Sequence, residues 1–160
     1  MEKAPHFCLE GITPDGKVKT ICLDELLSQK PFLVLYFYPR DNTPGCTREA
    51  CEFRDNLSRI TPYATVAGIS PDSIKSHENF RKKHELNFYL LSDPEKEVCR
   101  LYGAYGEKKM YGKVREGVIR STFIISSDGI ILKSWRNVRV KGHVDKVIEE
   151  LKRLSEGEGE

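Results

Sequence analysis

Two cysteines, Cys46 and Cys51, stand where a helix is expected to follow a buried strand. Residues 31–38 form an apolar run with the length and the β-branched and aromatic content of a strand buried on both faces, and Pro39 ends it. From Cys46 onward, apolar residues recur at helical spacing at Ala50, Phe53, Leu57 and Ile60. Cys46 would therefore lie in the first helical turn, beside unpaired N–H groups and the positive end of the helix dipole. Such a position favours the thiolate, the reactive form of cysteine.

The spacing of these cysteines predicts that they cannot join while the helix is intact. Five residues of helix turn the side chains about 140° apart and separate their Cα atoms by roughly 8 to 9 Å. A disulfide needs less than about 7 Å between Cα atoms. If Cys46 reacts with Cys51, the first turn and a half of the helix must unwind, so the sequence predicts a conformational cycle together with a chemistry.

Length favours one domain, and the lack of a signal or membrane segment favours an intracellular protein. The chain has 160 residues, with 26 basic and 24 acidic side chains and a net charge of +2. We expect one domain over 1–154 and a disordered polar tail at 155–160. Nucleic acid and membranes are not expected as partners, since basic residues are not grouped with aromatic ones and no segment resembles a signal or a membrane span. A cytoplasmic location is expected.

The remaining cysteines and the histidines carry no clear chemistry in the sequence. Five cysteines without a secretory signal make a disulfide framework improbable, so we expect Cys8, Cys22 and Cys99 to be buried thiols. Whether two of these three form a second disulfide stays open. The four histidines are scattered and are expected at the surface. With no CxxC or HxxxH spacing, no metal site is predicted, and no cofactor is expected.

Strands alternating with helices predict an α/β fold with a mixed central sheet, flanked by helices and opened by an N-terminal β-hairpin. Strands are expected at residues 7–9, 18–21, 31–38, 64–69, 88–91, 118–125 and 130–135. Helices are expected at residues 23–27, 46–60, 70–84, 92–102 and 144–154. Residues 103–117, rich in glycine and lysine, are expected to form a long surface loop.

This order, with a cysteine at the start of the helix after the central strand, resembles the thioredoxin-like fold. The local sequence Pro39-x-x-x-Thr43-x-x-Cys46 is similar to the peroxiredoxin signature, and Cys51 five residues later is similar to the peroxiredoxin Q, or bacterioferritin comigratory protein, branch. Residues 106–113 and 119–123 are also similar to that branch. The resemblance spans roughly residues 4 to 153.

The resemblance implies a peroxidase for hydrogen peroxide and small organic hydroperoxides. Cys46 would be the peroxidatic cysteine, and its sulfenic acid would condense with Cys51 to an intramolecular disulfide. Thioredoxin or a similar dithiol protein would then reduce this disulfide. The resemblance also favours a monomer, since the resolving cysteine lies in the same chain.

Three more residues match the family's active site, and a fourth supports it. Pro39 would shield the sulfur from water, while Thr43 and Arg120 would hydrogen-bond the peroxide; Glu49 matches a carboxylate that contacts the arginine. Such groups are needed because a lowered thiol pKa gains little rate by itself, since nucleophilicity falls with it. Donors aimed at the developing oxygen charge are worth on the order of 10² to 10³ in rate.

Other interpretations stay open. The Cys46–Cys51 bond could serve a peroxide sensor or a partner-binding module instead of an enzyme, because its formation would remodel the helix. A disulfide reductase is less favoured, since CxxxxC replaces CxxC. Arg120 and Glu49 could also form a purely structural ion pair.

Overall fold

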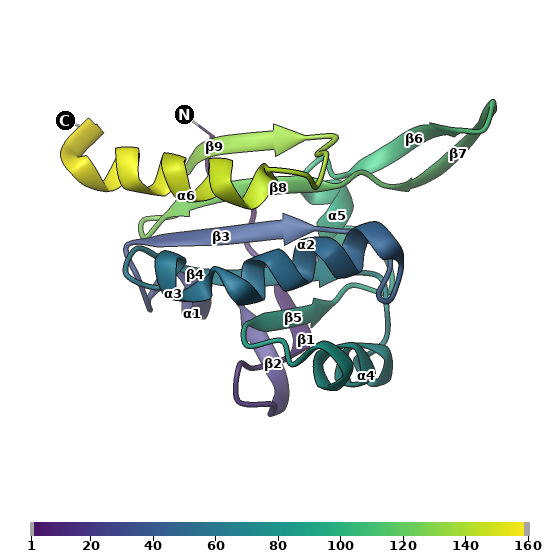
Figure 1. The fold of residues 1–160 in the computed structure, drawn as a ribbon, viewed down its shortest axis with the longest axis horizontal. Coiled ribbons are helices and arrows are strands. Elements are labelled where there is room, and N and C mark those ends of the chain that lie inside the picture. Colours follow the sequence, from purple (N-terminus) through teal and green to yellow (C-terminus); the bar gives the residue numbers. More distant parts are fainter. Residues whose placement is uncertain (1, 159–160) are drawn as a thin grey trace.

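A seven-stranded mixed sheet forms the centre of the computed structural model, which describes residues 2–158. The strands of this sheet are β1 (Cys8–Ile12), β2 (Val18–Cys22), β3 (Phe32–Phe37), β4 (Ala64–Ser70), β5 (Tyr89–Ser92), β8 (Ser121–Ser126) and β9 (Ile131–Arg136). Their order is β2-β1-β5-β4-β3-β8-β9 (Figure 1). The central strands β3, β4 and β5 are parallel, and the outer strands pair antiparallel.

Helices cover both faces of the sheet. They are α1 (Leu23–Leu27), α2 (Pro44–Asp55), α3 (Leu57–Ile60), α4 (Ile74–His84), α5 (Glu97–Leu101) and α6 (His143–Arg153). Apolar residues of α2, α3, α4 and α6 pack in one cluster, and those of α1 and α5 pack in a second cluster. Figure 1 shows α2 and α6 running across the same side of the sheet. The predicted mixed sheet with flanking helices and an N-terminal hairpin is confirmed.

The helical stripe predicted after Cys46 positions α2 on the sheet. Cys46, Ala50 and Phe53 are buried on the face of α2 that packs against the sheet. The ring of Phe53 stacks on that of Tyr36 in β3, with 4.7 Å between centroids. Burial of a side chain such as Phe53 stabilises the fold by roughly 1.5 to 3 kcal/mol. The helix that carries Cys46 is thus fixed to the central strand.

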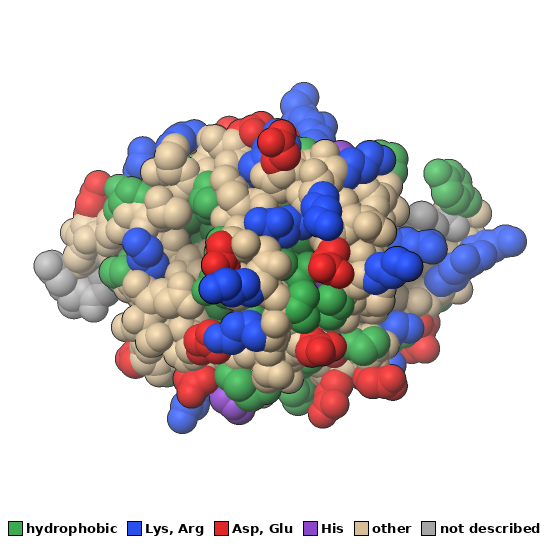
Figure 2. Space-filling model, turned by 90° about the horizontal axis from the view of Figure 1, so that it is seen from below, with side chains coloured by type: hydrophobic (Ala, Val, Ile, Leu, Met, Phe, Trp, Pro, Cys, Tyr) green, Lys and Arg blue, Asp and Glu red, His purple; other side chains and the backbone are tan. Residues whose placement is uncertain are grey.

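The surface loop predicted at 103–117 is wrong. Residues Tyr105–Met110 and Lys113–Val118 form strands β6 and β7, an antiparallel hairpin that projects from one end of the molecule (Figure 1). Its turn, Tyr111-Gly112, has φ of 53° and 76°, the backbone of a tight hairpin turn. Apart from Val118, the residues of the two strands whose burial is described are exposed or half-buried, so the sequence lacks the apolar alternation of a strand. Figure 2 shows lysine and arginine side chains at this projecting end.

Some predicted helix boundaries also move. Helix α4 begins at Ile74, because the hydroxyl of Ser73, not of Ser70, accepts the capping hydrogen bond from Ser76 N. Helix α5 begins at Glu97, five residues after the predicted start. An irregular helical turn follows α6 at Leu154–Glu158 and so includes residues 155–158 of the predicted tail. Residues 159 and 160 of that tail lie outside the described residues.

The prediction of buried thiols is wrong for two of three cysteines. Cys8 is exposed, Cys22 is half-buried, and the two form a disulfide. They are directly opposed in the β1–β2 ladder, and the hydrogen bond from Leu23 N to Phe7 O beside them marks a non-hydrogen-bonded pair, the closer kind of cross-strand pair. Their Cα atoms lie 4.0 Å apart. Cys99 is a fully buried thiol, as predicted.

Candidate active site

Cys46 is the third residue of α2 and is 2% exposed. The extended backbone of Thr43 and the proline at the first helical position start this helix. The first helical hydrogen bond runs from Thr47 N to Thr43 O at 2.8 Å. The N–H groups of Gly45 and Cys46 precede it and have no acceptor within the helix. The sulfur therefore lies at a helix end that offers donors to an anion or to oxygen.

Arg120 joins Cys46 to Glu49. Its Nη2 donates to Cys46 Sγ at 3.2 Å, and its Nη1 donates to Glu49 Oε1 at 2.7 Å. A Cβ on Gly45 would lie 3.3 Å from Nη2, so glycine leaves room for the guanidinium. The predicted strand over 118–125 is wrong at this point: Arg120 lies in the short link between β7 and β8. The backbone N–H of Val138 holds its carbonyl at 2.9 Å.

Burial affects the pKa values of Glu49 and Arg120. Burial raises the pKa of Glu49 to about 7, against the opposing effect of Arg120. Glu49 Oε2 is buried and has no hydrogen-bond partner among the described residues. Burial also disfavours the charge of Arg120, but the neighbouring Glu49 and Cys46 outweigh it and raise the pKa of Arg120. The guanidinium therefore stays charged beside the Cys46 sulfur.

The other predicted site residues lie on the same loop and helix. The Thr43 hydroxyl donates to Arg40 O at 2.9 Å, so its free lone pairs remain acceptors. Pro39 is half-buried two residues after β3. Cys51 is a half-buried free thiol in the same unbroken helix as Cys46. The structure thus brings Cys46, Glu49 and Arg120 into one hydrogen-bonded group, whereas Cys51 lies around the helix from Cys46.

Asp41 anchors the loop that carries Pro39 and Thr43, a role that the sequence analysis missed. Its buried carboxylate accepts hydrogen bonds from Tyr38 OH at 2.6 Å and from Ser76 Oγ at 2.8 Å. Its backbone N–H donates to Asp72 Oδ2 at 2.7 Å. These contacts tie the loop to β4 and α4, which fixes the approach to the first turn of α2.

His77 completes this anchor. The expected surface position is wrong for His77 and also for His143, which is buried with its Nε2 2.8 Å from Thr122 Oγ1. His77 is fully buried, with Nδ1 2.7 Å from Asp41 Oδ2 and Nε2 2.9 Å from Leu91 O. A signal was present, since His77 lies three residues before the apolar Phe80 on the inner face of α4. Asp41, Asp72 and His77 are close enough to ligate a cation, but they are bonded to one another and to their neighbours. We assign the cluster to loop anchoring.

A polar cavity of about 440 Å³ lies beside the link that carries Arg120. It is lined by Glu107, Lys108, Lys109, Ile119, Arg136 and Asn137. Burial, together with Arg120, lowers the pKa of Lys108, while Cys46 acts in the opposite direction. The electrostatic influence of both Arg120 and Cys46 thus reaches this lysine in the cavity wall.

Comparison with known proteins agrees with this geometry. A thiol at a helix start, contacted by a half-buried arginine in a fold with a mixed central sheet, fits a thiol-dependent peroxidase, and the AhpC/TSA family model matches residues 1–134. The chain belongs to this family. The chain is 44% identical over 151 residues to a putative peroxiredoxin Bcp of Coxiella burnetii, covering 94% of this chain and 96% of that protein. It is 41% identical over 156 residues to peroxiredoxin Bcp of Bacillus subtilis, covering 97% and 96%.

Solved structures point to the same branch. A cysteine mutant of Xanthomonas campestris peroxiredoxin Q is 40% identical, with a TM-score of 0.80, over 91% of this chain and 90% of that chain. The bacterioferritin comigratory protein of the same organism, studied for alkyl peroxide reduction, is 39% identical with a TM-score of 0.79, over the same shares. The predicted thioredoxin-like fold and the resemblance to the peroxiredoxin Q branch are confirmed. No helix within residues 2–158 is long and apolar enough to cross a membrane.

Proposed function

We propose that this thiol peroxidase reduces hydrogen peroxide and small organic hydroperoxides with Cys46 as the peroxidatic cysteine and Cys51 as the resolving one. A dithiol protein such as thioredoxin recycles it, and the enzyme acts as a cytoplasmic monomer. The observation that carries the proposal is the guanidinium of Arg120, whose two amino groups contact the Cys46 sulfur and Glu49.

In the first step, the Cys46 thiolate attacks one peroxide oxygen. The new S–O bond forms as the O–O bond breaks, and the departing oxygen takes up a proton and leaves as water or as an alcohol. Cys46 is oxidised to the sulfenic acid. Arg120, with the N–H groups of Gly45 and Cys46, donates to the developing oxygen charge. Thr43, whose proton is engaged with Arg40 O, accepts a hydrogen bond from the peroxide.

In the second step, the Cys51 thiolate attacks the Cys46 sulfur. The S–O bond breaks, the oxygen leaves as water with one added proton, and a disulfide forms. Both cysteines lie in one unbroken helix, so the first turns of α2 must open before their sulfurs meet. The dithiol partner then donates two electrons and two protons, and it leaves as a disulfide.

The proposal extends to organic hydroperoxides for two reasons. A cavity of about 440 Å³, lined in part by Ile119 next to Arg120, offers a place for an alkyl group on this side of the molecule. The related Xanthomonas campestris protein is described for alkyl peroxide reduction.

Single-turnover oxidation tests the roles of the two cysteines. Reduced protein is mixed with one equivalent of hydrogen peroxide, quenched with an alkylating agent within seconds, and mapped by mass spectrometry. We expect a Cys46–Cys51 cross-link, while Cys99 stays a thiol. Cys46→Ser should abolish peroxide consumption, and Cys51→Ser should consume one equivalent and then stop. A free Cys46 thiol after seconds, or equal turnover in both variants and the wild type, would contradict the proposal.

A peroxide sensor or partner-binding module is the second candidate, because closing the Cys46–Cys51 bond must remodel α2. A sensor should react slowly with peroxide and bind a partner in only one redox state. Fast turnover with a dithiol reductant, and no protein retained selectively by either redox state in pull-downs, would reject this candidate.

A further inference from the structure

The Cys8–Cys22 disulfide lies apart from the Cys46 site. It joins β1 to β2, and β2 is the edge strand of the sheet. Strands β5 and β4 lie between β1 and β3, the strand that leads to α2. The peroxidase cycle uses neither Cys8 nor Cys22.

The disulfide is open to a reductant in the folded protein. Cys8 is exposed and Cys22 is half-buried. Strand β1 pairs with β5 only at Gly11 and Ile12, so the end of β1 that carries Cys8 has strand β2 as its sheet neighbour. Because thiol–disulfide exchange requires access to the bond, an exposed edge position is where it can occur without unfolding.

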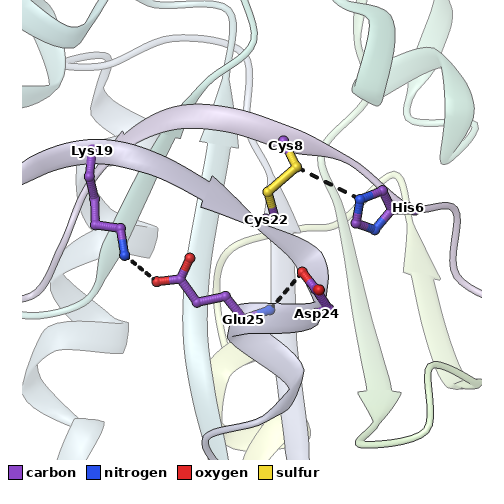
Figure 3. The surroundings of a disulfide bond; sticks show 6 residues. All are labelled: His6, Cys8, Lys19, Cys22, Asp24 and Glu25. Carbon is purple, nitrogen blue, oxygen red and sulfur yellow. Dashed lines mark hydrogen bonds and ion pairs between the residues drawn. A yellow bond between two sulfur atoms is a disulfide. The ribbon is translucent and has the colours of Figure 1, made fainter.

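The surroundings of the bond favour release of Cys8. His6 Nε2 lies 3.7 Å from Cys8 Sγ, and the imidazole stands on the Cys8 side of the bond (Figure 3). A histidine at this place can stabilise or protonate the thiolate that leaves during exchange. Figure 3 also shows two acidic residues of α1 in these surroundings: Glu25, which pairs with Lys19, and Asp24, whose carboxylate accepts a hydrogen bond from Glu25 N.

We propose that Cys8–Cys22 is a second redox site, a reversible disulfide that dithiols reduce in the folded protein independently of Cys46 and Cys51. A reductant thiolate attacks Cys22 Sγ, the bond to Cys8 breaks, and Cys8 leaves with a proton from His6 or water. The second reductant thiol attacks the mixed disulfide and releases Cys22. Two electrons and two protons pass to the protein, and the reductant becomes a disulfide. A disulfide oxidant such as oxidised glutathione reverses the exchange.

The redox state of the Cys8–Cys22 disulfide should control how often the β1–β2 hairpin opens at the edge of the sheet. In the oxidised protein, β1 and β2 share a covalent link as well as a backbone ladder from Cys8↔Cys22 to Ile12↔Val18. After reduction, only the ladder and the side-chain contacts hold the outer strand. The end of the hairpin near Cys8 should then open locally more often.

A redox titration tests the proposal. The Cys46→Ser/Cys51→Ser variant is equilibrated in buffers with graded ratios of reduced to oxidised dithiothreitol, quenched by alkylation and mapped by mass spectrometry, while circular dichroism follows the fold. We expect Cys8 and Cys22 to gain alkyl groups together, in one two-electron transition, with the circular dichroism spectrum unchanged. Oxidised glutathione should restore the bond, and the midpoint should be the same in the wild type.

Three outcomes would overturn the proposal. Reduction that occurs only when the circular dichroism signal is lost would make the bond an inert cross-link. Free Cys8 and Cys22 thiols under oxidising conditions would show that the disulfide does not form. A midpoint of Cys8–Cys22 reduction that differs between the wild type and the Cys46→Ser/Cys51→Ser variant would show that the two cysteine pairs are not independent. The Cys8→Ser/Cys22→Ser control should lack the transition yet react with peroxide, so failure here is separate from failure of the peroxidase proposal.

Discussion

At the residue scale, the guanidinium of Arg120 places a positive charge in contact with both Glu49 and the Cys46 sulfur. Arg120 keeps one amino group on the buried carboxylate of Glu49 and presents the other to the Cys46 sulfur. A planar, permanently charged fork suits this task, and a lysine would offer a single point charge. Glu49 therefore holds the arginine in contact with the sulfur.

Loss of the guanidinium should slow the peroxide reaction. We expect Arg120→Met to lower the second-order rate constant of Cys46 with hydrogen peroxide by about 10²- to 10³-fold, because the donor to the breaking O–O bond is removed. Stopped-flow measurement of peroxide consumption checks this. Arg139→Met, the same change at an exposed position, is the matched control. A loss no larger than in that control would show that Arg120 is only structural.

The buried Glu49 should make stability depend on pH. Its pKa is about 7 in the folded protein, against an ordinary value of 4.5. Between these values the unfolded state has lost the proton that the folded state keeps, so the free energy of unfolding falls as the pH rises. Relative to Glu49→Gln, we expect the free energy of unfolding of the wild type to fall by on the order of 3 kcal/mol across this pH window. Outside the window, the two curves of unfolding free energy against pH should be parallel.

Urea unfolding at several pH values measures this difference. Glu149→Gln, on the exposed face of α6, is the matched control. Parallel curves for the wild type and Glu49→Gln from pH 4.5 to 7 would contradict the assignment of a buried, proton-holding Glu49.

At the element scale, α2 positions Cys46 and also opposes the second step of the proposed cycle, the closure of the Cys46–Cys51 disulfide. Its unbroken run from Pro44 to Asp55 keeps Cys46 beside Arg120 and holds Cys51 away. Resolution then depends on how often the first turns open. Helix stability and the rate of disulfide closure should therefore be inversely related.

A substitution on the exposed face of α2 separates these effects. Arg48 is exposed and pairs with Glu52 at 3.0 Å. Arg48→Gly and Arg48→Ala both remove this pair, but glycine costs the helix about 1 kcal/mol more than alanine. We expect closure of the Cys46–Cys51 bond to be about fivefold faster in the glycine variant, since about 1.4 kcal/mol corresponds to tenfold.

Quenched-flow alkylation after a peroxide pulse measures that closure. Formation of the sulfenic acid should proceed at the same rate in both variants, since neither change touches the contact of Arg120 with the sulfur. Equal closure rates in the glycine and alanine variants would mean that opening of α2 does not limit resolution.

At the scale of the whole molecule, the sheet separates two cysteine pairs. Cys46 and Cys51, the pair that we propose to react, lie on the helix that follows the central strand, and the Cys8–Cys22 pair links the two outermost strands at one edge. The edge link should contribute to global stability, because it closes a loop with a sequence separation of 14 residues.

Removal of the edge link should therefore destabilise the oxidised protein. We expect Cys8→Ser/Cys22→Ser to unfold with a free energy about 3 kcal/mol lower than the wild type, as a loop of this length predicts. Urea unfolding without reductant gives the measurement. In excess dithiothreitol the two proteins should become nearly equal. Equal stability under oxidising conditions would show that the bond contributes nothing.

The sequence by itself determined the features that depend on local pattern. The apolar run at 31–38 predicted the central strand, and the helical spacing after Cys46 predicted the stripe that packs α2 on the sheet. Both follow from short-range periodicity, which neighbouring residues specify. The hairpin β6–β7 was not predicted because, apart from Val118, its residues of described burial are exposed or half-buried, so no apolar alternation marks its strands.

Only the tertiary structure decided which distant side chains meet. Arg120 reaches a sulfur 74 positions earlier in the chain, and its approach had been expected from resemblance to a family, not from spacing. The pairing of Cys8 with Cys22 depends on the register of two strands, and the burial of His77 depends on the loop that presents Asp41. The physical reason is common to all three: a contact between distant residues is set by the packing of whole elements, which a local pattern does not encode.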